Sequence, residues 1–291
     1  MDKVYTLADA ETMELADVPL AVLGKPIAHS MSPLMHNAAL RRLSLSRPEL
    51  AGWHYYKFEI DPKDLGEALR LFHARNFRGI NLTIPHKEVV FEFLEGADEF
   101  ARLAGAANTL VRTDGGWHGS NTDGFGLAHA VKSFSGMDFA GADVAVLGAG
   151  GAARAACFYS ALNGAASVRI SNRTRLKAQC IAEELKLAGF DSAGELSEIA
   201  PGSVIINATS VGLHPGDAPV LDFSKVPDTC AFFDMPYVRG GETPSVLAAR
   251  AAGLRAASGL AMLAWQGAKS LSIWAGLPDP PGEIMLAALE A

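Results

Sequence analysis

The sequence predicts an α/β protein of two domains, in which helices cover mostly parallel sheets. Three observations lead to this fold class. The chain has 291 residues, enough for two domains of ordinary size. Short apolar strands alternate with amphipathic helical stretches, an order typical of parallel sheets with helices on both faces. The alternation pauses and then restarts after "NTDGFGLAHAVKSF", so we place a domain boundary near Gly124–Phe125.

The first half contains three strand–helix repeats. Its strands are rich in aromatic and β-branched residues, as in "HYYKFEI", and its helices space apolar residues three or four apart. Ser32 followed by Pro33 suits an N-cap followed by the first helical position. The expected elements are a strand at 20–24, a helix at 32–43, a strand at 54–60, a helix at 62–74, a strand at 79–84 and a helix at 87–94.

The second half repeats the alternation of strands and helices, with different turns between them. A glycine turn joins its first strand to its first helix, and a long apolar helix ends it. The expected elements are a strand, turn and helix at 143–162, a strand and turn at 167–174, a helix at 175–189, strands at 203–210 and 230–237, and helices at 244–253 and 259–276.

Composition argues against several classes of protein. The net charge is −7 and basic residues form no long cluster, so we expect no nucleic-acid partner. The N-terminal segment lacks the pattern of a signal peptide, and no apolar run could span a bilayer. The 3 cysteines are widely spaced without a CxxC motif, so we expect neither a disulfide framework nor a metal site. We therefore expect a soluble, cytoplasmic protein, a monomer or a homodimer, without a membrane partner.

The glycine turn "VLGAGGAAR" fits the pattern G-x-G-x-x-A with Gly148, Gly150 and Ala153. The first glycine permits a tight turn, the second lets the backbone approach a pyrophosphate, and the small third residue lets the helix pack on the strand. Such turns can also be merely structural. Because this one follows an apolar strand and opens a helix, we expect a Rossmann-type dinucleotide-binding domain.

The end of the next strand indicates which dinucleotide binds. NAD-binding folds usually carry an Asp or Glu there for the ribose 2′-hydroxyl. This chain has Asn172, Arg173 and Thr174, then Arg175 and Lys177. A guanidinium pairs with a 2′-phosphate, which a carboxylate would repel. We therefore expect NADP, although a solvated basic helix start is the plain alternative.

The segment "NLTIPHK" places polar groups at the rim of an apolar strand. We expect Leu82 and Ile84 on its buried face, with Asn81 and Thr83 sharing the opposite face. Lys87 follows at once. A lone lysine at a strand end is ordinarily just solvated charge, so its meaning depends on the other polar residues.

Comparable polar side chains occur near other elements. They are Ser30 and Ser32 after the first strand, Asn108 inside an apolar strand, Asp123 beside a glycine, and Gln266 on an apolar helix. Singly, each has a structural explanation as a helix cap, a turn or a satisfied buried amide. Together they suit a small polyhydroxylated anion bound at the carboxyl ends of the strands.

These motifs together resemble the shikimate dehydrogenase family, from about Leu20 to the C-terminus. They occur in the family's order, as "HSMSP", "NLTIPHK", "GAANTL", "GSNTDG", "GAGGAAR", "NRT", "NATSVG", "DMPY", "ETP" and "GLAMLAWQ". The resemblance implies a substrate-binding catalytic domain formed by residues 1–124 and completed by the C-terminal helices at 260–291. It places an NADP-binding domain at 125–259 between them. It also implies NADP-linked interconversion of 3-dehydroshikimate and shikimate.

The resemblance also implies roles for individual residues. Ser30 and Ser32 match ligands of the substrate carboxylate, and Lys87 and Asp123 match the catalytic pair. The residues that match ligands of the ring hydroxyls, or border the same pocket, are Thr83, Lys87, Asn108, Asp123, Tyr237 and Gln266. The residues that match cofactor-binding positions are Glu99, Gly148, Ala149, Gly150, Gly151, Ala152, Asn172, Arg173, Thr174, Lys177, Met235 and Ala261. Ser120, Pro236 and Ala261 depart from the family's usual residues.

Three other functions are weighed against this one. A quinate or broad quinate/shikimate dehydrogenase would tend to favour NAD, which would go with an acidic residue where Arg173 stands, and would often carry Thr where Ser32 stands. A non-catalytic NADP-binding sensor would be expected to have lost Lys87 or Asp123. A structural interaction protein would not explain the glycine turn.

Overall fold

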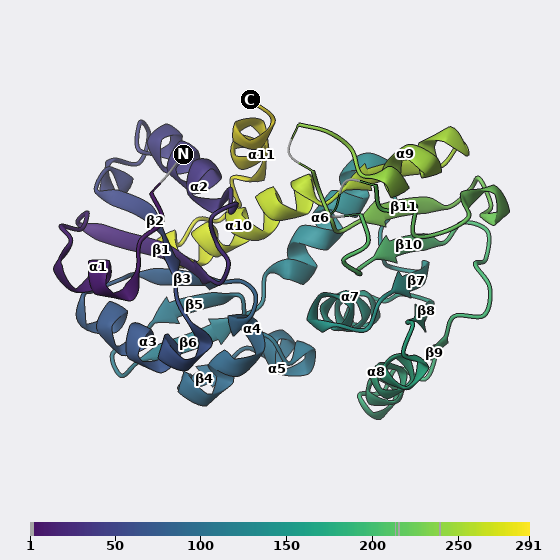
Figure 1. Cartoon of the computed structure of the whole chain (residues 1–291), viewed down its shortest axis with the longest axis horizontal. Coiled ribbons are helices and arrows are strands. Elements are labelled where there is room, and N and C mark those ends of the chain that lie inside the picture. The colour runs from purple at the N-terminus through teal and green to yellow at the C-terminus, as the bar shows by residue number, and fades with distance from the viewer. Residues whose placement is uncertain (1–2, 213, 215, 239) are drawn as a thin grey trace. The chain divides into compact units, whose positions relative to one another are not determined.

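The computed structural model describes residues 3–212, 214, 216–238 and 240–291 (Figure 1). The chain divides into two compact units. One contains Met1–Thr122 and Leu263–Ala291, and the other contains Asp123–Met262. The first break thus follows residue 122 rather than 124, and the second follows residue 262 rather than 259. The ligand assigned to each unit stays a prediction.

The first unit is built on a six-stranded sheet with the strand order β2-β1-β3-β5-β6-β4. Its strands are β1 (Val18–Gly24), β2 (Trp53–Glu59), β3 (Gly79–Leu82), β4 (Gly96–Ala97), β5 (Thr109–Arg112) and β6 (Trp117–Ser120). β1 runs parallel to β2 and β3, and β4 runs parallel to β6. β5 is antiparallel to both β3 and β6, and a short turn joins β5 directly to β6.

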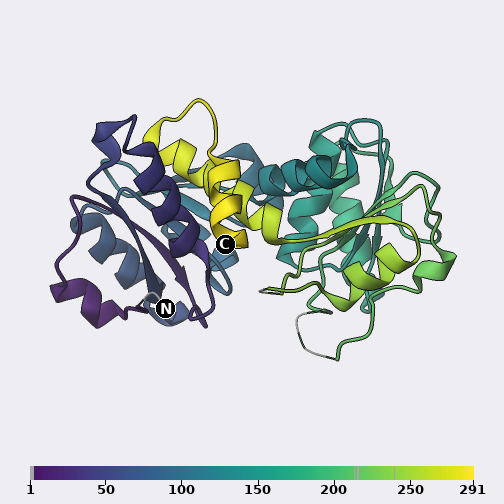
Figure 2. The ribbon, with the colours of Figure 1, turned by 90° about the horizontal axis from the view of Figure 1, so that it is seen from above.

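Helices cover both faces of this sheet (Figure 1). Alternate residues of β1 point to opposite faces, so Ala21 and Leu23 join one hydrophobic cluster and Leu20 and Val22 join another. The helices of the unit are α1 (Leu7–Thr12), α2 (Ser32–Leu43), α3 (Leu65–Ala74), α4 (His86–Val89), α5 (Glu99–Ala104), α10 (Leu260–Ala275, from Leu263 on) and α11 (Gly282–Glu290), with 3-10 turns at Pro48–Leu50, Pro62–Asp64 and Val90–Phe93. The last helices pack on the first strands, since Trp274 shares the cluster of Leu20, and α11 lies against α2 (Figure 2).

The second unit contains a six-stranded sheet in which every pair of neighbours is parallel. Its strands are β7 (Asp143–Leu147), β8 (Ser167–Ser171), β9 (Ala193–Glu195), β10 (Val204–Asn207), β11 (Ala231–Asp234) and β12 (Arg255–Ser258). Read from β9, the order is β9-β8-β7-β10-β11-β12. This is the 3-2-1-4-5-6 order of a dinucleotide-binding sheet, whose direction reverses between β7 and β10.

Helices alternate with the strands of this second sheet. They are α6 (Asp123–Ser135), α7 (Gly151–Leu162), α8 (Arg175–Leu187) and α9 (Pro244–Ala251), with a 3-10 turn at Phe223–Lys225. On one face, Val246 and Ala249 of α9 pack with Phe232 of β11 in a hydrophobic cluster. The predicted α/β class with a Rossmann-type unit is therefore confirmed.

Two expectations for the segment "NLTIPHK" are wrong. The strand ends at Leu82 rather than at residue 84, because the chain turns at Thr83, whose carbonyl accepts the His86 N–H at 2.8 Å. Ile84 is consequently 73% exposed rather than buried. Asn81 is only 5% exposed, since β3 lies inside the sheet with helices over both of its faces.

Two further elements differ from expectation. Asn108 lies just before β5 rather than inside it. The helix expected at 87–94 is a single α-turn, α4, continued by the 3-10 turn Val90–Phe93. Among the described residues, no helix combines the length and apolar character needed to cross a membrane.

Candidate active site

Ser30 and Ser32 lie in the loop between β1 and α2. The N–H of Ser30 donates to the Ile27 carbonyl at 3.0 Å, and the Ser30 hydroxyl accepts the Ser32 N–H at 3.3 Å. Ser32 is the first helical residue, Met31 is the N-cap, and no side chain makes the usual capping bond. Ser30 thus satisfies one of the free N–H groups at the start of α2, but neither serine occupies the N-cap position or makes the usual capping bond. A hydroxyl that accepts one hydrogen bond can still donate to a ligand.

Thr83 and Lys87 lie at the opposite ends of the turn after β3. The Thr83 N–H donates to the Leu23 carbonyl of β1 at 2.9 Å. The Lys87 carbonyl accepts the Ala107 N–H at 2.9 Å, which ties α4 to the segment that leads into Asn108. Between them, the His86 ring contacts the Ile60 carbonyl through Nε2 at 2.9 Å, and burial lowers the His86 pKa. His86 is therefore a neutral anchor for this turn near pH 7.

Asn108 is the centre of a buried polar network in the first unit and is 1% exposed. Its Nδ2 donates to the Thr122 hydroxyl at 3.0 Å and to Gln266 Oε1 at 3.3 Å. Its Oδ1 accepts from the Thr122 N–H at 2.9 Å and from the Thr109 hydroxyl at 2.9 Å. The Gln266 Nε2 donates to the Leu263 carbonyl at 2.9 Å. Two predicted site residues, Asn108 and Gln266, are thus brought together, and both also serve the fold.

Asn81 supports this network from the neighbouring strand. Its Nδ2 donates to the Asn108 carbonyl at 2.9 Å, the Thr109 hydroxyl at 3.1 Å and the Ser270 hydroxyl at 3.0 Å. Its Oδ1 accepts the Tyr55 hydroxyl at 2.7 Å. Burial raises the Tyr55 pKa well above its usual value, and a hydrogen bond with the Ser32 side chain opposes that rise. Polar groups therefore connect Ser32 to Asn108 through the interior of one unit.

The predicted residues are divided between the two units. Those in the first unit are Ser30, Ser32, Thr83, Lys87, Glu99, Asn108 and Gln266. Those in the second are Asp123, Gly148, Ala149, Gly150, Gly151, Ala152, Asn172, Arg173, Thr174, Lys177, Met235, Tyr237 and Ala261. Asp123 begins α6 and directly follows Thr122, the last residue of the first unit. Glu99 is exposed in the first turn of α5, and its expected role near the cofactor stays a prediction.

The glycine turn has the geometry that a phosphate-binding loop requires. Gly148 has φ +116°, and a Cβ there would lie 2.8 Å from the Ala208 carbonyl oxygen, so a side chain is excluded. A Cβ at Gly150 would meet nothing within 4 Å, which leaves open space beside the backbone. Gly150 caps α7 without a side-chain hydrogen bond, and Ala153 is fully buried. The first N–H groups of α7 can therefore face an anion.

The turn after β8 supplies cations. The Asn172 side chain donates to the Thr174 carbonyl at 3.0 Å and shapes the turn. Arg175 is engaged by Glu195 of β9 at 2.5 Å. Arg173 and Lys177 are exposed, and within the described part of the chain neither forms an ion pair. These two side chains are the cations that a phosphate could recruit here.

Comparisons with known proteins support the same interpretation. Residues 22–110 match the model of the shikimate dehydrogenase substrate binding domain. A shikimate dehydrogenase (NADP(+)) of Methanothrix thermoacetophila is 42% identical over 272 residues, which cover 93% of this chain and 96% of that protein. The chain belongs to the shikimate dehydrogenase family.

Two solved structures of this fold bear on the site. The shikimate 5-dehydrogenase of Thermus thermophilus, in complex with NADP(H) and shikimate, has a TM-score of 0.82 and 36% identity, covering 94% of this chain and 98% of that one. The ligand-free 5-ketofructose reductase of a Gluconobacter strain has a TM-score of 0.83 and 30% identity, covering 96% and 99%. The fold alone therefore does not select the substrate.

Sequence reasoning missed several buried polar residues of this family member. Tyr55, Thr109 and Ser270 were not predicted, although Ser270 lies four residues after Gln266 on the same face of α10. In the second unit, fully buried Asp234 accepts hydrogen bonds from Asn207 at 2.6 Å and from Thr243. Burial raises the pKa of Asp234, and these two hydrogen bonds oppose the rise. Asp234 could have been noticed in the sequence, because it is a charged residue in an otherwise apolar strand.

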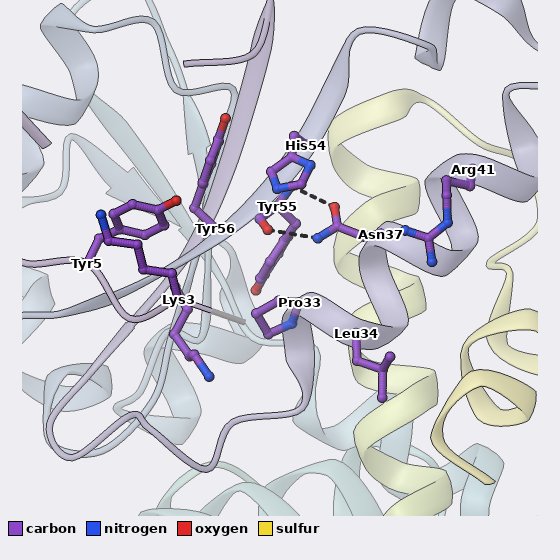
Figure 3. A pocket seen from close by; sticks show the side chains of 10 residues that line it. Lys3, Tyr5, Pro33, Leu34, Asn37, Arg41, His54, Tyr55 and Tyr56 are labelled. Carbon is purple, nitrogen blue, oxygen red and sulfur yellow. Dashed lines mark hydrogen bonds between the residues drawn. The ribbon is translucent and has the colours of Figure 1, made fainter. Parts of the chain in front are cut away.

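A cavity of about 310 Å³ lies at the outer edge of β2 (Figure 3). Asn37 of α2 borders it and pairs with the backbone of Tyr55, accepting its N–H at 2.9 Å and donating to its carbonyl at 3.0 Å. These bonds occupy part of the edge of the sheet and so protect it from pairing with another strand. Lys57 also lines this cavity.

Proposed function

We propose that this protein is an NADP-linked shikimate dehydrogenase, which interconverts 3-dehydroshikimate and shikimate in the biosynthesis of aromatic amino acid precursors. The observation that carries the proposal is the 42% identity, over 93% of this chain, to a protein named shikimate dehydrogenase (NADP(+)). The Thermus structure, which holds NADP(H) and shikimate, supports the same pair of ligands.

The substrate is held by side chains that follow the strands. The hydroxyls of Ser30 and Ser32 donate to its carboxylate, supported by a loop in which neither serine caps α2 in the usual way. Thr83, Lys87, Asn108, Asp123, Tyr237 and Gln266 contact or border its ring hydroxyls. The internal bonds of Asn108 and Gln266 hold their amides in fixed orientations, which favours a ligand of matching shape.

The residues of the second unit suit NADP. The loop Gly148–Ala152 and the uncapped start of α7 offer N–H groups and open space to the pyrophosphate. Arg173 and Lys177 hold the 2′-phosphate, with Asn172 and Thr174 shaping their turn. Met235 and Ala261 line the nicotinamide side, and Glu99 lies near the cofactor. NADPH supplies the hydride that is added to C3 of the substrate.

Lys87 and Asp123 perform the proton transfer. As the hydride reaches C3, the Lys87 ammonium gives a proton to the C3 oxygen, so the ketone becomes an alcohol. In the reverse direction the neutral amine takes that proton back. Asp123 orients the ammonium and stabilises the charge that develops. The backbone bond between Lys87 and Ala107 supports this role, because it holds α4 against the Asn108 segment.

Two rivals remain testable by the same assay. A quinate dehydrogenase would bind the carboxylate of its substrate with the same loop of Ser30 and Ser32. A 5-ketofructose reductase is the second rival, because a structure of such an enzyme matches this chain with a TM-score of 0.83. 5-Ketofructose has no carboxylate, so the paired serines Ser30 and Ser32 favour shikimate.

The decisive measurement follows NADPH absorbance at 340 nm. Shikimate and quinate are each tested with NADP⁺ and NAD⁺, and 5-ketofructose is tested with NADPH. We expect the highest kcat/KM for shikimate with NADP⁺, at least about tenfold above NAD⁺. Faster turnover of quinate or 5-ketofructose, or no turnover of shikimate, would overturn the proposal.

A further inference from the structure

Lys57 is a buried lysine beneath the loop that carries Ser30. It lies in β2, opposite Val22 of β1, and is 4% exposed. Its Nζ donates to the Ala28 carbonyl at 2.9 Å and approaches the Ser30 carbonyl at 3.5 Å. The ammonium therefore holds the backbone of this loop from below.

No carboxylate lies within ion-pair distance of this ammonium among the residues that the structure describes. Glu59, two residues along β2, accepts the Ile27 N–H at 3.4 Å and holds the other side of the loop. The cavity beside Lys57 is also lined by Lys3 and Arg41 and by no acidic residue (Figure 3). Lys3 is ion-paired with Asp9 at 3.9 Å, so Lys57 and Arg41 are the cations of this cavity that form no ion pair in the described part of the chain.

A buried charge without a partner is costly, and an apolar side chain of similar length would avoid that cost. The loop needs a hydrogen-bond donor at this point, but a neutral donor would serve the two carbonyls as well. The positive charge itself therefore calls for an anion on the accessible side of the loop. Such a charge acts over several ångströms where water is excluded.

We propose that Lys57 is a positioning residue for the substrate carboxylate. It holds the carbonyls of Ala28 and Ser30 so that the hydroxyls of Ser30 and Ser32 face the anion, and its charge favours an acid over a neutral ligand. This inference rests on the proposed function, because it takes the carboxylate of shikimate as the anion. It assigns to β2 a part in substrate specificity.

The test compares shikimate with its methyl ester in the wild-type protein, Lys57→Met and Lys57→Gln. Methionine keeps the length and removes both donor and charge, whereas glutamine keeps an N–H donor and removes only the charge. Lys25→Met is the matched control, since Lys25 is on the same loop but exposed and paired with Asp61 at 2.7 Å. Both KM with NADP⁺ and calorimetric affinity without turnover are measured.

We expect both Lys57 variants to raise KM for shikimate by about tenfold, a usual size for one charge-assisted interaction. The methyl ester should be affected by less than about twofold, and kcat for shikimate should change little. The Lys25 variant should resemble the wild type. Equal losses for acid and ester would reduce Lys57 to a structural support of the loop, and an unchanged KM for shikimate would overturn the proposal altogether.

The two proposals fail in different ways. If the wild-type protein does not turn over shikimate, the proposed function is wrong, and calorimetry still decides on Lys57. A wild-type preference for binding the acid that both variants lose supports its role. No preference for the acid in the wild-type protein contradicts it.

Discussion

Replacing Asn81 with leucine tests whether the buried polar network holds the site together. Leucine has the same number of non-hydrogen side-chain atoms as asparagine and the same branching, although its methyl groups are bulkier, so the change removes hydrogen bonds without opening a large cavity. Asn81 is 5% exposed and bonds Tyr55, Thr109, Ser270 and the Asn108 carbonyl. The substitution therefore affects four partners at once.

The expected loss follows from what each partner retains. Ser270 and Thr109 still bond each other at 2.8 Å, and the Asn108 carbonyl still accepts the Leu82 N–H at 2.9 Å. Only the Tyr55 hydroxyl loses its acceptor at 2.7 Å. One poorly satisfied buried hydroxyl plus the lost bonds costs about 2 to 4 kcal/mol. The melting temperature should fall by roughly 4 to 15 °C in a protein of this size.

Urea unfolding of Asn81→Leu, Tyr55→Phe and the double variant measures this coupling. In the double variant the poorly satisfied hydroxyl is absent. Its loss of unfolding free energy should therefore be at least about 1 kcal/mol smaller than the sum of the losses in the two single variants. Ser272→Ala is the control, because the Ser272 hydroxyl is buried without a hydrogen-bond partner in the described part of the chain. Additive losses, or an Asn81 variant as stable as the control, would refute the reasoning.

Three further predictions concern the chemistry, the cofactor and pH. Lys87→Ala should lower kcat by about 10²-fold or more while KM moves much less; steady-state kinetics showing a change in KM alone would make Lys87 a binding group only. Arg173→Ala should lower kcat/KM with NADP⁺ and leave kcat/KM with NAD⁺ unchanged. Equal losses of kcat/KM with both cofactors would contradict the assignment of Arg173 to the 2′-phosphate. Burial lowers the pKa of His36 to about 4, below its ordinary 6.5, so the unfolded chain binds a proton that the folded protein resists. Stability should therefore be intact above about pH 6.5 and decline toward pH 4, by about 2 kcal/mol at pH 5. Urea unfolding at pH 7 and 5 should show a smaller difference in His36→Phe than in the wild type, and an unchanged difference would contradict the role of this ring.

The local pattern of the chain was sufficient for most of the fold. Helix α2 begins at Ser32 and ends at Leu43, as its proline and its apolar spacing predict. The turn at Gly148 was predictable because it depends on one residue type without a side chain. Small strands such as β4, β9 and β12 were missed, since two to four residues carry too little periodicity.

Polar residues in the middle of the first sheet were less predictable. Alternation placed Asn81 opposite a buried face, yet β3 is covered on both faces and Asn81 is buried. Its partners come from positions up to 189 residues away, as with Ser270. No window of sequence contains both members of such a pair, so their contact could not be inferred from spacing.

The α/β class, the glycine turn and the polar residues near most strand ends follow from the chain alone, because they depend on local backbone preferences and on patterns within a few residues. The network of Asn108, Gln266, Asn81 and Ser270, and the place of Lys57 beneath Ser30, arise only when the chain is folded. Burial explains the difference, because a polar group removed from water must find its partner wherever the fold brings one. The order of residues in the sequence does not show which distant segment will supply that partner.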